Sequence, residues 1–449
     1  MSTELARRIA AEHAAAAPSL PSAVIAPARR RRAIDALVST GLPTTRDENW
    51  RYANLRPLER VRFAPAPARI DITAAELPAP IPDFARYVFL DGLYAAGASQ
   101  PQPRRADLTV RIPSGTASGG ERSRSEAAQD LEGAEASGSS SEAAFALLNE
   151  AFALDCAQIE VTGAEGAVEA PACIEVVFVA GTPAPAGSSY PRLRVHLGPH
   201  ARLRLIERHV SLGAEPSAFV DSAVDVRLDG GASLDHYRIQ ALGAQAVWMD
   251  TLGAVLGGSA AYRLHAIGLG ALAARSNVRV RLGGEGAQLA LHAVAVGDHA
   301  QVLDTYALVE HAACHTRTTE HFRGIAAGRS RVAFNGKIIV QPGARGADST
   351  QSLRGLIAGS AAEIDVRPQL EIYTDEVRCS HGATAGKLDE TMLFYLLSRG
   401  LDADTARRLL KWAFLEDVVS RIDIAALRRQ IETSLAGQLP ERDTLKELL

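Results

Sequence analysis

Apolar and polar side chains alternate along most of the chain between residues 159 and 377. The alternation is cleanest at 224–228, 234–239, 278–282 and 363–366. A period of two predicts strands that bury one face. Small-residue turns separate these segments, and no helical pattern of about 10–15 residues interrupts them, which disfavours alternating strand and helix layers. We therefore predict a mainly β core.

The strands also repeat at a loose interval. Leu203, Leu234, Tyr262 and Leu289 each follow a small-residue turn, and they are spaced by 31, 28 and 27 residues. A repeat of that size without helices is typical of a solenoid of short coiled strands. A β-sandwich produces similar local signals, so the repeat alone does not choose between the two folds.

The regions before this core differ from it in pattern. Residues 1–70 are predicted to form helices and loops, in which Trp50 and Tyr52 either form a partner-binding patch or anchor a short arm to the main body. Residues 71–158 are predicted to be a connecting segment, with a mobile Ser/Gly-rich loop at 113–143 and a short helix after it. The core would then occupy residues 159–386.

Residues 387–449 are predicted to form a C-terminal helical domain. Three amphipathic stretches follow Asp389, then Asp402 or Asp404, then Asp423, whose side chains can each cap a helix N-terminus. Gly400 ends the first stretch. The three helices would make a small bundle or a docking surface for another chain.

Composition narrows the function classes. The 449 residues carry a net charge of −4. Without a basic surplus, a nucleic-acid partner is disfavoured. Four cysteines in so long a chain are not a disulfide framework and fit a reducing compartment, so we expect a cytoplasmic protein. No apolar run of about 18 residues occurs, so no membrane span is expected.

The candidate chemistry lies at Cys379 and His381, near the end of the last strand pattern. In an extended segment both side chains point to one face, roughly 6.5–7 Å apart along the strand. A thiolate and an imidazole can share one metal ion, but two ligands do not complete a tetrahedral site. The other ligands would come from elsewhere in the chain or from another protein. The alternative is a packed cysteine beside a hydrogen-bonded histidine.

Two further motifs carry weaker signals. His311, Cys314 and His315, with His321 beyond, lack the first cysteine of a haem-attachment motif, and we favour polar residues on a strand and its turn over a metal site. The segment 382–388 resembles a phosphate-binding loop but is one residue short, and it ends in leucine where serine or threonine would hold magnesium. We reject it, so any ATP chemistry would come from a partner.

Four motifs together suggest a family. The chain carries FNGKI at 334–338, PQLEI at 368–372, VRCSHGAT at 377–384 and LFYLLSRG at 393–400. In order and spacing these motifs resemble the SufB/SufD family of iron–sulfur cluster assembly proteins. The resemblance covers nearly the whole chain and is most specific after residue 334. His381 followed by Gly-Ala-Thr is similar to the SufD branch, because SufB-type chains tend to carry His-Glu-Ala there.

The resemblance implies a right-handed parallel β-helix core flanked by N-terminal and C-terminal helical regions. It implies a heterodimer with SufB through the β-helices, and C-terminal helices that dock the ATPase SufC in a complex with two SufC subunits. The chain would be a non-catalytic scaffold that holds no cofactor stably by itself and supports the entrance of iron. His381, with Cys379 beside it, would face transient iron or a nascent iron–sulfur cluster at the SufB interface. Whether a flavin joins the complex is left open by the sequence.

The side chains expected to contact SufC lie on the first two C-terminal helices. They are Leu393, Phe394, Tyr395, Arg399, Leu409, Leu410, Trp412 and Phe414. Other functions remain as alternatives at this point: a SufB-type scaffold with its own cluster, a homodimer that stores metal, and a β-helix enzyme that acts on polysaccharide. The enzyme would need an aromatic-lined groove with clustered carboxylates.

Overall fold

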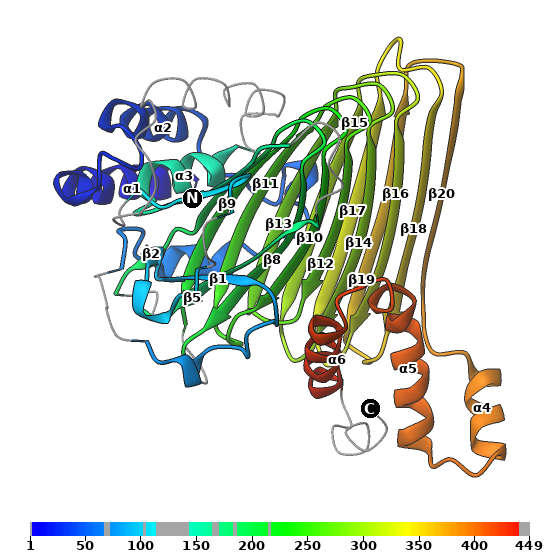
Figure 1. Ribbon diagram of the computed structural model, residues 1–449. Coiled ribbons are helices and arrows are strands. Elements are labelled where there is room, and N and C mark those ends of the chain that lie inside the picture. The colour runs from blue at the N-terminus through cyan, green and yellow to red at the C-terminus, as the bar shows by residue number, and fades with distance from the viewer. Residues whose placement is uncertain are drawn as a thin grey trace.

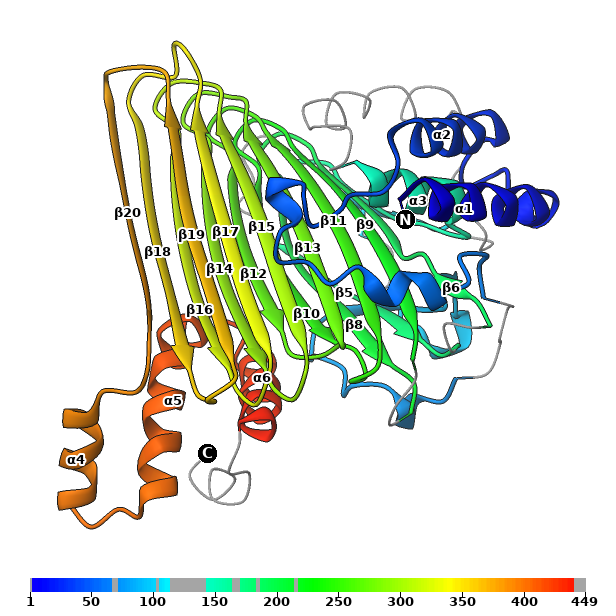
Figure 2. The same cartoon turned by 180° about the vertical axis from the view of Figure 1, so that it is seen from behind.

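The β core is a parallel β-helix of about seven turns whose walls are two ten-stranded sheets (Figures 1 and 2). The computed structural model describes residues 2–66, 72–101, 105–113, 143–163, 170–182, 186–213 and 217–439. The solenoid prediction is therefore confirmed over the sandwich. The predicted mobile loop at 113–143 lies outside the described residues apart from its two end positions.

The two sheets alternate along the chain, so that each coil adds one strand to each of them. Sheet B contains, in spatial order, β2 (Leu93–Tyr94), β1 (Ala85–Leu90), β5 (Ala172–Ala180), β8 (Arg202–Ser211), β10 (Ser233–Ala241), β12 (Ala261–Gly268), β14 (Gln288–Gly297), β16 (Arg317–Ala326), β18 (Ala347–Ile357) and β20 (Val377–Gly386). Sheet A contains β19 (Glu363–Ile372), β17 (Arg331–Val340), β15 (Val302–His311), β13 (Ala273–Leu282), β11 (Val247–Leu256), β9 (Phe219–Leu228), β7 (Arg192–Leu197), β4 (Ala157–Val161) and β3 (Leu108–Arg111), with β6 (Ser188–Ser189) paired to β9.

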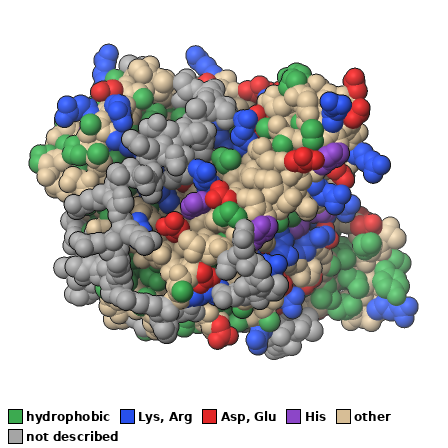
Figure 3. Space-filling view, turned by 45° about the horizontal axis from the view of Figure 1, so that its top comes forward, with side chains coloured by type: hydrophobic (Ala, Val, Ile, Leu, Met, Phe, Trp, Pro, Cys, Tyr) green, Lys and Arg blue, Asp and Glu red, His purple; other side chains and the backbone are tan. Residues whose placement is uncertain are grey.

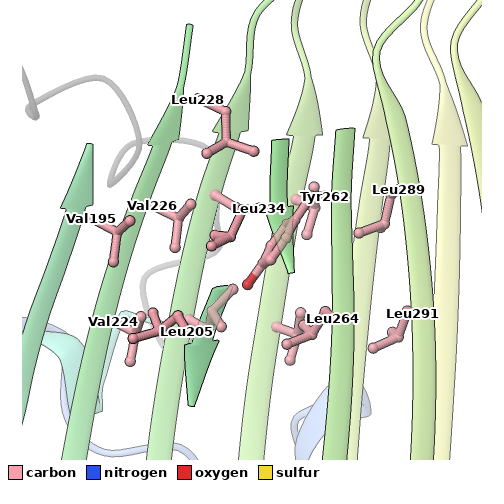
Figure 4. Close-up of a cluster of buried hydrophobic side chains, with 14 of the residues drawn as sticks. Val195, Leu205, Val224, Val226, Leu228, Leu234, Tyr262, Leu264, Leu289 and Leu291 are labelled. Carbon is pink, nitrogen blue, oxygen red and sulfur yellow. The ribbon is translucent and has the colours of Figure 1, made fainter. Parts of the chain in front are cut away.

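The repeat positions stack in register. Leu203, Leu234, Tyr262 and Leu289 are ladder partners on the consecutive strands β8, β10, β12 and β14, and all four are buried. Figure 4 shows Leu234, Tyr262 and Leu289 in the interior with valines and leucines of both sheets. Each fully buried leucine contributes about 1.5–3 kcal/mol. The repeat thus reflects one column of interior packing.

Helices cover the outer face of each sheet. On sheet A lie α1 (Ser2–Ala16), α2 (Pro27–Thr40) and α3 (Ala144–Phe152), which share a buried cluster with residues of β9, β11 and β13. On sheet B lie α5 (Ala403–Val419) and α6 (Ala425–Gln438), while α4 (Glu390–Ser398) projects beyond α5 (Figure 1). Short 3-10 turns occur at Ala17–Ser19, Glu48–Trp50, Arg56–Arg60, Ala74–Glu76 and Ala96–Ala98. Among the described helices, none is long and apolar enough to cross a membrane.

The aromatic segment near residue 50 anchors an arm to the outside of sheet A. Trp50 is fully buried, and the guanidinium carbon of Arg275 lies 4.4 Å from the centroid of its ring. The guanidinium of Arg331 lies 5.0 Å from the centroid of the Tyr52 ring. Of the two interpretations of this pair, the anchor is the one that the packing supports.

Two of the three predicted helix caps are confirmed. The Asp389 carboxylate accepts hydrogen bonds from two backbone N–H groups at the start of α4, and Asp402 does the same for α5. Asp423 does not cap α6; that prediction was wrong. Its carboxylate instead accepts a hydrogen bond from the Tyr237 hydroxyl and lies 3.4 Å from the Arg204 guanidinium, so it ties the start of α6 to sheet B.

Candidate functional site

The two ends of the β-helix differ in how they are closed. At the N-terminal end, the short strands β2 and β3 pair antiparallel with β1 and β4. At the other end, β19 and β20 are the last strands of their sheets, and no strand in the described part of the chain pairs with their outer edges (Figure 1). We call these two edges, with the interior-facing side chains above them, the open end. Solenoids normally close such an end with a capping element.

Of the two edges at the open end, β19 carries a proline, Pro368, whereas β20 lacks two of the features that usually protect a sheet edge. Strand β20 is ten residues long and contains neither proline nor lysine, which natural proteins place on exposed edges. On β19, Ile364, Val366 and Leu370 are only partly buried against the core, and Ile372 is 41% exposed. One more β-helix coil would cover these side chains. The open end therefore has the edge and the apolar surface of an interface.

Cys379 and His381 lie in this open end, on β20. Their ladder partners on β18 are Ser349 and Gln351, both of which are buried. Cys379 is half-buried and packs against the interior cluster, whereas His381 is exposed. By strand alternation both side chains take the interior face, about 6.6 Å apart along the strand. The pair thus lies on β20 at the rim of the open end, in a layer that no described strand covers.

The Cys379 side chain is a free thiol. Burial raises its pKa, and the nearby Asp348 carboxylate raises the pKa further. A backbone N–H of Ser349 acts in the opposite direction. The thiolate that binds metal is therefore disfavoured until a cation arrives to compensate its charge.

A polar layer lies directly beneath the rim, and sequence reasoning missed it. The Gln351 Nε2 group donates to Glu320 Oε2 at 2.7 Å and to the backbone oxygen of Gly336 at 3.0 Å. Glu320 is fully buried, and burial raises its pKa to about 7. Strand β16 carries polar residues on both of its faces, so its alternation does not reveal that Glu320 faces inward.

The other histidine and cysteine residues near β16 do not converge. Both His311 ring nitrogens are engaged, Nδ1 with Thr316 Oγ1 at 2.8 Å and Nε2 with Thr318 Oγ1 at 3.0 Å, and burial lowers the His311 pKa to about 4. His315 lies exposed in a turn. Across the described ranges, no group of three or more His, Cys, Asp or Glu residues is arranged to hold a metal ion. The segment 382–386 is part of strand β20, which agrees with rejection of a phosphate-binding loop.

A row of aromatic rings crosses the outer face of sheet B beneath the C-terminal helices. Tyr237, His265, His292 and His321 are ladder partners on adjacent strands, with ring centroids 4.9, 5.0 and 5.5 Å apart. Burial lowers the pKa of His265 to about 4 and that of His292 to about 3. The row is therefore neutral near pH 7, and it packs where sheet B meets α5.

The predicted partner-binding residues fall into two groups. On α4, Phe394 is 72% exposed and Tyr395 is 55% exposed, and the Arg399 guanidinium lies 5.1 Å from the Tyr395 ring centroid. Figure 3 shows hydrophobic side chains gathered at the right-hand edge of the molecule, where α4 projects. Leu393, on the same helix, is half-buried. No residue of α4 is buried, so the helix presents an uncovered apolar surface.

The second group lies on α5 and is partly covered by the protein itself. Leu409, Leu410, Trp412 and Phe414 are half-buried. Trp412 and Phe414 pack against the cluster that joins α5 and α6 to sheet B. Trp412 and Phe414 therefore help attach α5 to the β-helix. Leu409 and Leu410 also lie on α5.

A family model and two similar proteins indicate the same family for this chain. The family model described as SUF system FeS cluster assembly, SufBD core domain, matches residues 178–414. The chain is 28% identical over 405 residues to the iron–sulfur cluster assembly protein SufD of Escherichia coli (strain K12). The aligned region covers 90% of this chain and 91% of that protein. It is 27% identical over 412 residues to an iron–sulfur cluster assembly SufBD family protein of Synechocystis sp., with 90% and 89% covered.

Proposed function

This chain belongs to the SufBD family of SUF-system iron–sulfur cluster assembly proteins, and we propose that it is the SufD-type subunit of a scaffold that it forms with SufB. The observation that carries the proposal is the open end formed by β19 and β20. A SufB chain of the same family would place its own β-helix coil there, pair with the free edges and bury Ile364, Val366 and Ile372.

We propose that His381 donates an imidazole nitrogen to iron, or to a nascent cluster, at this seam. Two potential ligands at the rim form an incomplete set, which a second chain can complete. Thiolate and sulfide, the soft ligands that iron–sulfur chemistry requires, would come mainly from SufB. Cys379 would join only as a thiolate, after a bound cation offsets the burial that raises its pKa. Iron or the cluster is cargo that passes through the seam.

The chain would act as a non-catalytic scaffold, with ATP hydrolysis supplied by SufC docked on α4. Exposed Phe394, Tyr395 and Met392 provide the apolar contact that such docking needs. Helix α5 is tied to sheet B by the ion pair between Arg323 and Asp417 and by a shared buried cluster. A pull on α4 and α5 when SufC binds ATP would therefore reach the β-helix, strain the seam and let iron enter.

We place this scaffold in the cytoplasm, because all four cysteines are free thiols, as expected in a reducing compartment. In the absence of SufB, the same open end would allow a second copy of this chain to pair with it as a homodimer. Sedimentation of the isolated chain and of the chain mixed with SufB measures both states, and SufB is expected to replace the second copy.

The test is co-expression with SufB and SufC, followed by measurement of complex mass and of iron and sulfide content. His381→Ala is expected to leave the complex intact and to lower its iron and sulfide content at least tenfold. Ser380→Ala is the matched control, because Ser380 is the exposed neighbour on the opposite face of β20. Unchanged mass together with unchanged iron content in His381→Ala would refute the role of His381.

A further inference from the structure

The interior beneath the open end contains a carboxyl group without a compensating charge. Glu320 is fully buried, its Oε2 accepts the hydrogen bond from Gln351, and its Oε1 has no hydrogen-bond partner. No basic side chain among the described residues forms an ion pair with it. An isolated buried carboxylate is costly, so such a group normally stays protonated or binds a cation.

Two more oxygen atoms on the interior face of β18, the strand that pairs with the strand of Glu320, are buried and unpartnered. They are Gln351 Oε1 and Ser349 Oγ, and both residues are 1% exposed. Gly336 approaches from sheet A, where an added Cβ would lie 2.8 Å from both Gln351 Nε2 and Glu320 Oε2. Glycine therefore leaves the space that the carboxyl and amide groups occupy. We call Glu320 Oε1, Gln351 Oε1 and Ser349 Oγ the interior oxygen cluster.

The interior oxygen cluster faces the open end and is closed on the other side. In the ladder, Gln351 lies between Glu320 and His381, so Glu320 lies two strands, or about 10 Å, below the rim histidine. Ser349 lies directly beneath Cys379. Below Glu320 the same column continues with Leu291, which is buried and apolar. Along this column of described residues, the open side of the cluster is therefore the rim.

We propose that the interior oxygen cluster is a holding site for one hard divalent cation, with Glu320 as its charged ligand, and that the cation enters past His381. Carboxylate, amide and hydroxyl oxygens are the donors that such cations take, and Fe²⁺ accepts them as Mn²⁺ does. That the natural cation is Fe²⁺ rests on the proposed function, whereas the site itself does not.

Binding of the cation to Glu320 would release one proton. The cation displaces one proton from the Glu320 carboxyl, which then ligates through its oxygen, and the proton leaves to solvent. Because burial raises the pKa of Glu320 to about 7, affinity is expected to fall as the pH drops below 7, approaching tenfold per pH unit. A site made of exposed carboxylates would show no such dependence between pH 6 and 7.

The test is titration of the full-length chain with Mn²⁺ alone, followed through the loss of the free-ion paramagnetic resonance signal. The chain is expected to bind one Mn²⁺, and Glu320→Gln, which is isosteric with the protonated acid, is expected to weaken binding at least tenfold. Glu376→Gln is the matched control, because Glu376 is an exposed carboxylate close to β20. Equal Mn²⁺ affinity in the wild-type chain and Glu320→Gln, or no binding by the wild-type chain, would overturn the proposal.

One further variant makes the result decisive. Ser349→Ala removes an unpartnered hydroxyl, is expected to fold, and should weaken Mn²⁺ binding several-fold; an unchanged affinity would count against the cluster. The Mn²⁺ titration uses the isolated chain and involves no SufB. Failure of the SufB pairing in co-expression would therefore be distinguishable from failure of the interior site.

Discussion

Gln351 lies directly beneath His381 in the parallel ladder that joins β18 to β20. The two residues share the interior face of the β-helix, yet Gln351 is sealed from solvent and His381 is exposed. The boundary of the protein's own core therefore passes between them. The rim histidine occupies a layer that no described part of this chain covers, and this places a candidate metal ligand at the expected SufB interface.

The apolar face of α4 is predicted to bind SufC. Phe394→Ser combined with Tyr395→Ser should weaken SufC binding at least tenfold, because exposed aromatic anchors dominate such interfaces. Thermal stability of the chain should not change, since neither side chain contributes to the core. Val38→Ser on α2 is the control, being an exposed apolar residue far along the chain from α4. Undiminished SufC affinity in the double variant, measured by calorimetry, would contradict the docking site.

The histidine row is predicted to make stability depend on pH. The folded pKa of His265 is about 4 against an ordinary 6.5, so the fold favours the neutral ring. Its stabilisation is complete above pH 6.5 and is lost as pH falls toward 4, by about 2 kcal/mol at pH 5. The charged groups around the row are Arg263, Arg323, Arg354, Asp417, Arg421 and Asp423.

Urea titrations at pH 7.5 and pH 5 measure this effect as a difference in the free energy of unfolding. His292→Leu removes one proton-binding group, so the loss of stability between the two pH values should shrink. His381→Ala, which removes an exposed histidine, should leave the loss as large as in the wild-type chain. An identical pH dependence in His292→Leu and the wild-type chain would show that the row does not control acid stability.

The Trp50 anchor is predicted to be structural. Trp50→Ala should lower the free energy of unfolding by about 3–5 kcal/mol, because it empties a fully buried site beneath Arg275. Tyr52→Ala should cost about 1 kcal/mol or less, since Tyr52 is half-exposed and loses mainly its contact with Arg331. Denaturant unfolding measures both values, and equal losses in the two variants would contradict this division.

The sequence predicted the β-helix because the same interior packing position recurs in each coil. Leu203, Leu234, Tyr262 and Leu289 signalled the coil because each coil needs a bulky side chain at the same depth of the interior. The histidine row carried an equivalent signal, since Tyr237, His265, His292 and His321 are spaced by 28, 27 and 29 residues. That spacing matches the repeat and would have identified the row as one column.

Other features depend on contacts that no periodicity reports. Asp423 has the residue type and position of a helix cap, but the Tyr237 hydroxyl on sheet B competes for its carboxylate. Glu320 was missed because both faces of its strand are polar. The amphipathic pattern of α5 identified an apolar face, but it could not say whether a partner or sheet B covers Trp412 and Phe414.

The central claim is that His381 becomes an iron ligand when a second chain covers the open end, and iron-edge X-ray absorption of the co-purified complex with SufB and SufC tests it most directly. The wild-type complex is predicted to show a nitrogen ligand bound to iron that is lost in His381→Ala and retained in Ser380→Ala. An iron spectrum that is identical in the wild-type complex and in His381→Ala, at equal iron content, would contradict the account.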